Sequence, residues 1–357
     1  MSTESTKGFS FKQLRAHLQY AVDLEFWTIP FYMAAMYSIR DPSDRAYRLL
    51  QSIVYQEMFH LQLAANIANA YGDEPPIWHP IFRKPDDHFP DYEFPVYKDE
   101  IVNGKKVGVI PHLNFALDDP DPREIFSPYS AEIGPFDLKR LNGMCLVEYP
   151  EWDTQGQPSL SGDTSKYGSI GEFYDAVEIA AAGCAEKIRG NATQVDLFGR
   201  FYLNFSQPTI TEDGVAGLKQ VLKLIKVITD QGEGQTEGEA DIPAEYRNTT
   251  DDVEPHAMHF SKLDSLRKIM RHPEDFPKTY PLIPEPDSET QKEQQKAQER
   301  LKDNYSKFKV TLNELFSGGQ QPRLFAVEMA KLGGNILRFL QLGVIPNFNF
   351  PVEEEGV

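Results

Sequence analysis

Residues 50–64 read LQSIVYQEMFHLQLA, and this stretch decides the fold. Its apolar residues recur at steps of three and four, which is the period of a helix that buries one face. Glu57 and His60 lie on that same face. A carboxylate that points into a core is costly unless it is paired or bound to a cation. The spacing therefore predicts either a buried glutamate–histidine hydrogen bond or a metal site.

We expect the helix that carries this pair to span residues 43–71, with Ser43 as its N-cap and Gly72 as its stop. A first helix is predicted over residues 10–39, where apolar residues follow the same period. Pro30 removes one backbone donor from that first helix.

Residues 73–168 are rich in proline and show no sustained period. We interpret them as a loop-rich insertion with a hairpin around 101–109, where Asn103-Gly104 is a tight-turn signal. So long an insertion favours a functional role, such as a lid over a substrate pocket. Helical patterns return in five further stretches, which we place at residues 169–188, 214–233 continuing at 256–269, 289–316 and 322–342. The sequence predicts a mainly α-helical single domain, residues 1–357, with extra C-terminal helices.

The charge balance excludes several function classes. The 357 residues include 36 basic and 54 acidic side chains, which gives a formal net charge of −18. Such a chain repels nucleic acid and anionic membranes, so we expect neither as a partner. Two cysteines are too few for a disulfide framework or a thiolate metal site. The N-terminus lacks the apolar stretch of a signal peptide, and we expect a cytoplasmic protein.

Glu25 adds a second acidic side chain to an apolar stripe. It follows Leu14, Leu18 and Val22 on the inner face predicted for the first helix. The alternative is a surface position at the edge of the stripe. Two buried carboxylates that face one another raise a pKa sharply unless a cation lies between them. Di-metal carboxylate bundles use one glutamate from each of two helices and a Glu-x-x-His from each of the other two. Glu25 with Glu57 and His60 supplies half of that set.

The candidates for the other half of this ligand set follow the expected motif less closely. In the third helix the candidate is Glu172, although Ser169-x-x-Glu172 also fits a capping box, and Glu178 is the reserve. In the fourth helix the apolar stripe leads to Glu233, but no histidine follows three residues later. If residues 234–255 loop out, His259 could supply that position. This split motif is a hypothesis, and His256 is the alternative ligand one turn earlier.

The charge of this candidate set suits two divalent cations. Four glutamates contribute −4, and two histidines act as neutral donors. Mixed carboxylate and imidazole ligands favour iron, with manganese as the alternative, over calcium or structural zinc. The sequence leaves open whether the site holds one metal ion or two.

Five blocks of sequence also resemble a known family. The blocks are Leu24-Glu25-x-x-Thr28-Ile29-Pro30-x-Tyr32, Glu57-Met58-x-His60 with Asn66 and Gly72, Tyr167-Gly168-Ser169-Ile170-Gly171-Glu172-Phe173-Tyr174, Gln231-Gly232-Glu233-Gly234, and His259-Phe260. Together they resemble the ferritin-like family of iminophenyl-pyruvate dimer synthases, which includes domains of the enzymes that join tryptophan-derived imines in violacein and rebeccamycin assembly. The resemblance covers roughly residues 10–342. It implies a ferritin-like four-helix bundle with iron ligands at Glu25, Glu57, His60, Glu172, Glu233 and His259.

Three functions follow from that resemblance and the candidate set. The first is a non-haem iron oxidase or oxygenase of secondary metabolism, with O2 and a small, amino-acid-derived molecule as partners. The second is oxidative coupling of two amino-acid-derived imines, and the third is iron binding or storage without catalysis. Catalytic side chains other than metal ligands are not identified, and a homo-oligomer stays open. Phosphate-binding loops and the Gly-x-Ser-x-Gly motif of hydrolases are absent from the sequence.

Overall fold

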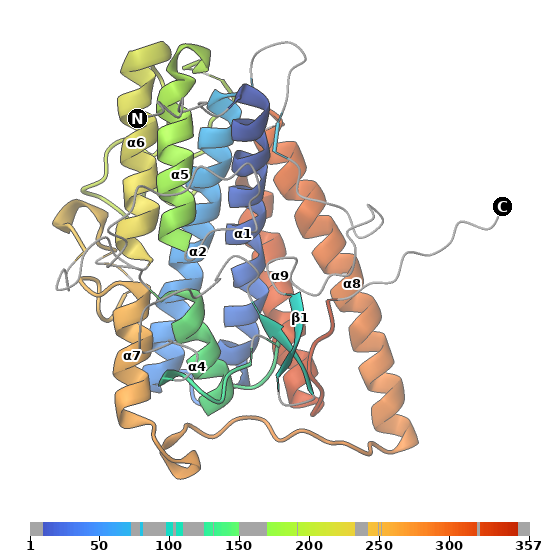
Figure 1. Ribbon diagram of the computed structural model, residues 1–357. Coiled ribbons are helices and arrows are strands. Elements are labelled where there is room, and N and C mark those ends of the chain that lie inside the picture. The colour runs from blue at the N-terminus through green and yellow to red at the C-terminus, as the bar shows by residue number, and fades with distance from the viewer. Residues whose placement is uncertain are drawn as a thin grey trace.

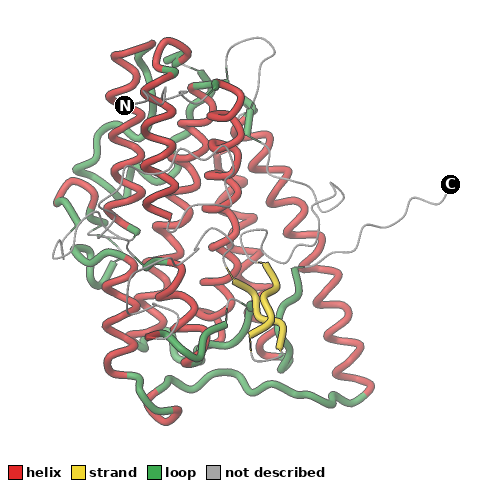
Figure 2. Tube along the Cα trace, in the orientation of Figure 1, coloured by secondary structure: helices red, strands yellow, loops and turns green. Residues whose placement is uncertain are grey.

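The computed structural model gives the arrangement of most of the chain. The residues that it describes are 10–72, 79–80, 98–102, 105–109, 125–130, 132–149, 170–190, 192–232, 242–248, 250, 252–319 and 322–348. Within them, the molecule is built almost entirely from helices, with a single short hairpin (Figures 1 and 2). No helix of this part is both long and apolar enough to cross a lipid bilayer.

Helices α1 (Phe11–Ser38) and α2 (Arg45–Ala70) form the central antiparallel pair of the bundle (Figure 1). Ser10 and Gln13 form a capping box at the start of α1, which continues through Pro30. The N-cap of α2 is Asp44 rather than the predicted Ser43, because the Asp44 carboxylate accepts a hydrogen bond from the Ala46 N–H.

The other two rods of the bundle are each made of two shorter helices. Helix α4 (Leu138–Val147) lies at the lower end of α5 (Ile170–Gly183), and α7 (His259–Ile269) lies below α6 (Gly214–Gln231) in Figure 1. The Phe260 N–H donates to the Gly232 carbonyl at 3.3 Å, so α7 resumes close to the end of α6. Helices α5 and α7 are shorter than the helices predicted over residues 169–188 and 256–269. Each broken rod leaves backbone ends inside the bundle.

The described parts of the stretch 73–168 contain regular elements. Strands β1 (Lys98–Val102) and β2 (Lys105–Val109) pair antiparallel, with Val102 opposite Lys105, as the turn signal predicted. The prediction of an irregular segment was wrong for residues 138–147, which form α4. The Asp137 carboxylate caps this helix by accepting from the Arg140 N–H. Ten residues hold too few turns for a period to stand out among the surrounding prolines.

Two long C-terminal helices cover one side of the central pair. Helix α8 (Ser288–Phe316) is capped by Asp287 and packs along α9 (Pro322–Gln341), and α9 contacts α1. Both lie on the side of α1 away from α5 and α6 in Figure 1. Short 3-10 turns complete the described elements at Ala185–Lys187, Ala244–Tyr246 and Pro273–Asp275.

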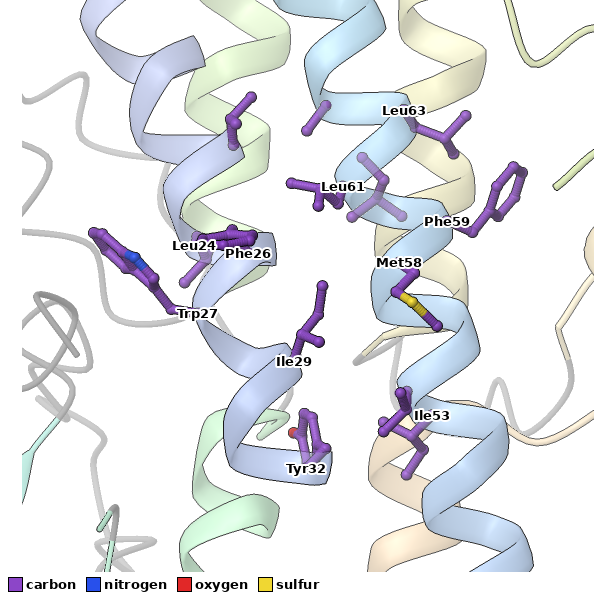
Figure 3. Close-up of a cluster of buried hydrophobic side chains, with 14 of the residues drawn as sticks. Leu24, Phe26, Trp27, Ile29, Tyr32, Ile53, Met58, Phe59, Leu61 and Leu63 are labelled. Atoms are coloured by element: carbon purple, nitrogen blue, oxygen red, sulfur yellow. The ribbon is translucent and has the colours of Figure 1, made fainter. Parts of the chain in front are cut away.

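The core follows the α1–α2 seam. Figure 3 shows Ile29, Met58 and Leu61 among the apolar side chains between and around the two helices. Most residues of both helices are buried, because α5 and α6 cover one side of the pair while α8 and α9 cover the other. Such a setting leaves polar side chains on α1 and α2 without water, so each needs a partner within the protein.

Candidate metal centre

Three of the predicted side chains meet in the core between α1 and α2. Glu25, Glu57 and His60 are each at most 4% exposed. One donor atom from each lies within 4.8 Å of the others, close enough to hold a metal ion. Glu57 and His60 are three residues apart on α2, so the helical period turns both toward the same side. The surface position considered for Glu25 is excluded.

A second group of the same kind shares Glu57. It contains Glu148, the residue that follows α4, and His259, the first residue of α7. The His259 Nδ1 atom lies 3.0 Å from Glu57 Oε1 and 3.4 Å from Glu148 Oε2. The breaks in the two outer rods thus bring one carboxylate and one imidazole to the level of Glu57.

Each carboxylate has one oxygen fixed by a hydroxyl group. Tyr174 donates to Glu25 Oε1, Thr28 donates to Glu57 Oε2 at 2.5 Å, and Tyr32 donates to Glu148 Oε1 at 2.5 Å. In each case the other oxygen lies beside a histidine ring. The three hydroxyls therefore hold the carboxylates in one orientation and leave one oxygen of each for the interior of the cluster.

The orientation of His60 is set by Gln231, the last residue of α6. The Gln231 Nε2 atom donates to the Tyr246 carbonyl at 2.6 Å, so the amide must present Oε1 to His60 Nε2 at 2.9 Å. The Nε2–H of His60 is consequently the donor. Its Nδ1 lone pair faces Glu25 Oε2 at 3.6 Å, which is the tautomer that a metal ligand requires.

Burial and mutual repulsion shift the titration of the cluster. Burial raises the pKa of Glu25 to about 8, although the Tyr174 hydroxyl opposes the shift, and it also raises the pKa of Glu57. Burial lowers the pKa of His60 to about 4. Burial also acts to lower the pKa of His259, but the carboxylates of Glu148 and Glu57 outweigh it and raise that pKa to about 9.

Without a metal ion, the carboxylates of Glu148 and Glu57 favour the protonated form of the His259 imidazole. Burial acts to raise the pKa of Glu148, but the His259 charge outweighs it and lowers that pKa. A divalent cation would replace the His259 proton and supply a stronger compensating charge to the same carboxylates. The cluster is suited to such an exchange, because one donor atom of each residue already faces its interior.

Two further observations test whether a metal ion fits. Both ring nitrogens of His259 are fully buried and make no hydrogen bond within the described residues, although Nδ1 is in close contact with two carboxylates. A cation between these carboxylates would accept the lone pair of Nδ1 and so give this buried nitrogen a partner. A cavity of about 20 Å³ also lies among Glu25, Glu57, His60 and Glu148. The donor set and the space both fit divalent metal ions.

The structure excludes some of the remaining predicted residues and leaves others outside the part that it describes. His256 is exposed, which removes it as the alternative to His259. Glu172 lies in the first turn of α5, and its side chain is outside the described residues, as is the whole of Glu233. Glu178 is only half-buried and belongs to neither group. Both Glu172 and Glu233 stay predictions.

Sequence reasoning missed Glu148. Its sequence signal was Asp137 followed by a ten-residue helical stretch that ends directly before this acid. Gln231 was also missed as a partner of His60, although it lies only two residues before the predicted Glu233. Neither role can be read from a periodic stripe, because both residues lie at helix ends.

Comparisons with known proteins agree with this geometry. A family model described as ferritin-like matches residues 18–268. The crystal structure of a ferritin-like protein from Caulobacter vibrioides is similar, with 40% sequence identity, a TM-score of 0.73 and coverage of 96% of this chain and 99% of that chain. No protein with curated annotation matches. The predicted fold class, a ferritin-like helical bundle with additional helices, is confirmed, and the chain belongs to the ferritin-like family.

Proposed function

We propose that this protein is an iron-dependent oxidoreductase that uses O2 to oxidise a small organic, amino-acid-derived molecule. The observation that carries the proposal is that Glu57 belongs to two buried groups of donors at once. A carboxylate common to two such groups can bridge two cations, as in the di-metal carboxylate bundles. Carboxylate and imidazole donors together favour iron or manganese.

The proposed ligands are Glu25, Glu57, His60, Glu148 and His259, and Glu172 and Glu233 remain candidates for further positions. Iron held there would pass electrons from the organic substrate to O2. The protein contributes a dry and preorganised site. Tyr174, Thr28 and Tyr32 hold the carboxylates, and Gln231 holds one imidazole in the ligand tautomer.

Access to the cluster limits where a substrate can bind. A cavity of about 20 Å³ has room for ions or a diatomic molecule, whereas organic ligands occupy hundreds of Å³. Ile170 and Gly232 line the same cavity at the ends of α5 and α6. We propose that the organic molecule approaches at this end, beside the ligands rather than among them.

A cluster of aromatic rings favours the coupling of aromatic imines as a second candidate function. Phe126, Tyr149 and Phe260 pack edge to face, with ring centroids 5.5–6.3 Å apart. Tyr149 follows Glu148 in the chain and Phe260 follows His259, so this aromatic cluster adjoins the second donor group. Ring surfaces of this kind recognise flat aromatic molecules. This candidate also agrees with the resemblance to the iminophenyl-pyruvate dimer synthases.

The test measures O2 consumption. The protein is first loaded with ferrous iron under anaerobic conditions and is then exposed to O2. Imines are generated from tryptophan or phenylalanine by a separate amino-acid oxidase, catalase removes its peroxide, and mass spectrometry identifies the products. Because the oxidase itself consumes O2, uptake is counted as the amount above that of the oxidase and catalase alone. We expect continued O2 uptake with substrate and a coupled dimer or an oxidised monomer. Glu57→Ala should abolish that uptake, whereas Glu178→Ala, outside the cluster, should not.

The same experiment separates catalysis from storage. A storage protein consumes O2 only in proportion to the iron supplied and then stops, whether or not a substrate is present. O2 uptake that never exceeds this amount with either imine, or that is equal in wild type and Glu57→Ala, contradicts the proposed oxidoreductase.

A further inference from the structure

A second and much larger cavity lies on a different face of the α1–α2 pair. It has a volume of about 550 Å³, within the range of sites for organic ligands. Its walls come from α1, α2, the segment 196–201 and α9, and it shares no lining residue with the cavity of the metal cluster. Glu57 faces the metal cluster, and the next residue, Met58, faces this cavity. The helix α2 therefore separates the two.

The walls of this cavity are apolar and adaptable. Half of the eight methionines of the chain line it, and these are Met33, Met36, Met58 and Met329. Methionine side chains adjust to the shape of a ligand and make favourable contacts with aromatic rings. Two ring pairs stiffen the rest of the wall, a stack of Tyr55 on Phe201 and an edge contact of Phe198 with Phe325. The cavity is partly open to solvent rather than enclosed, so a ligand can enter it from outside.

Two arginines give the cavity a positive edge. Arg200 and Arg323 both line it and are exposed, and neither forms an ion pair with any residue that the structure describes. The guanidinium of Arg200 lies 4.6 Å from the ring centre of Phe201, which keeps it at the cavity wall. Asp196 is the one acid among the lining residues, and its Oδ1 atom accepts from the Gly199 N–H at 2.7 Å. Two basic side chains and one acidic side chain therefore line the cavity, which is an unusual balance for a chain with a net charge of −18.

We propose that this cavity binds an apolar carboxylic acid, with the hydrophobic body between the methionines and the carboxylate at Arg200 and Arg323. Guanidinium groups match a carboxylate in geometry as well as charge. The mostly apolar walls favour an organic acid over a small hydrophilic anion such as free phosphate, because most of the lining side chains offer no polar contact. The inference does not rest on the proposed oxidoreductase, since the two cavities have separate walls.

The test is calorimetric titration of the full-length protein with 2-naphthaleneacetic acid and with its neutral amide. We expect saturable binding of the acid and at least about tenfold weaker binding of the amide. The double variant Arg200→Ala/Arg323→Ala should lower affinity for the acid by about tenfold or more and leave that for the amide unchanged. Ala326→Trp, which places an indole in the cavity from an exposed position on α9, should abolish binding of both.

Thermal unfolding and metal content of each variant serve as controls, and Met329→Trp is a second blocking variant if Ala326→Trp does not fold. Equal affinity for acid and amide overturns the assigned role of the arginines. Binding that survives both tryptophan variants, or no binding of the acid by the wild type at millimolar concentration, overturns the site.

Discussion

The cost of burying Glu25 should be visible as a stability gain in Glu25→Gln when no metal is bound. Burial raises the pKa of this carboxyl from 4.5 to about 8. Each pKa unit corresponds to about 1.36 kcal/mol, so a shift of 8 − 4.5 = 3.5 sets a ceiling of about 5 kcal/mol. Glutamine keeps the acceptor for the Tyr174 hydroxyl and cannot ionise. Allowing for relaxation of the site, we expect a gain of about 2 kcal/mol at high pH.

The pH dependence gives the sign of the contribution of Glu25 to the free energy of unfolding. The folded-state pKa of Glu25 lies above its unfolded value, so between pH 4.5 and about 8 the unfolded chain releases this proton while the folded protein retains it. The metal-free wild type therefore loses stability over that window, and the loss is complete above it. The glutamine variant lacks this contribution. The two proteins should differ little near pH 4.5 and most above about pH 8.

Denaturant unfolding of chelator-treated protein across this pH range measures the difference directly. Glu178→Gln on α5 is the matched control, because Glu178 lies outside the cluster and should show no such change. Added metal should reverse the order, since the wild type gains binding free energy that the glutamine variant lacks. Parallel stability curves for wild type and Glu25→Gln in the metal-free state would refute the reasoning.

Two further predictions concern neighbours of the cluster. Gln231→Leu removes the acceptor for His60 Nε2–H and should weaken metal binding by about 10–100-fold, measured by competition with a chelator, whereas Gln231→Glu keeps an acceptor and should lose less. Equal affinities for Leu, Glu and wild type would contradict this role. Lys262→Met leaves the Asp252 carboxylate buried without the ammonium that lies 2.7 Å away, and should cost about 3–5 kcal/mol in unfolding free energy. Lys262→Met combined with Asp252→Asn should recover much of that loss, and a double variant as unstable as the single one would argue against the pair.

The sequence predicts those parts of the site that depend on one helix at a time. Glu25, Glu57 and His60 lie on long helices whose apolar period shows which face is inward, so their convergence followed from the pattern. His259 required an additional hypothesis, a gap in the fourth rod, and the structure places it beside Glu57. Its partner Glu148 could not be found in this way.

Glu148 illustrates why the rest of the site is hidden from sequence patterns. It lies just past a ten-residue helix, and only the packing of α4 against α7 brings it to His259. The hydroxyl and amide partners have the same origin. Tyr174 and Gln231 act across helices, and contacts between elements are set by tertiary packing rather than by local period.

The shared position of Glu57 is most directly tested by the metal-to-protein ratio of iron-loaded protein, with Glu57→Ala, Glu148→Ala and Glu178→Ala measured in parallel. We expect about two ions per chain in the wild type and in Glu178→Ala, about one in Glu148→Ala, and few or none in Glu57→Ala, which removes the donor common to both groups. Full occupancy in Glu57→Ala, or the same loss from Glu57→Ala as from Glu148→Ala, would contradict a centre built around this carboxylate.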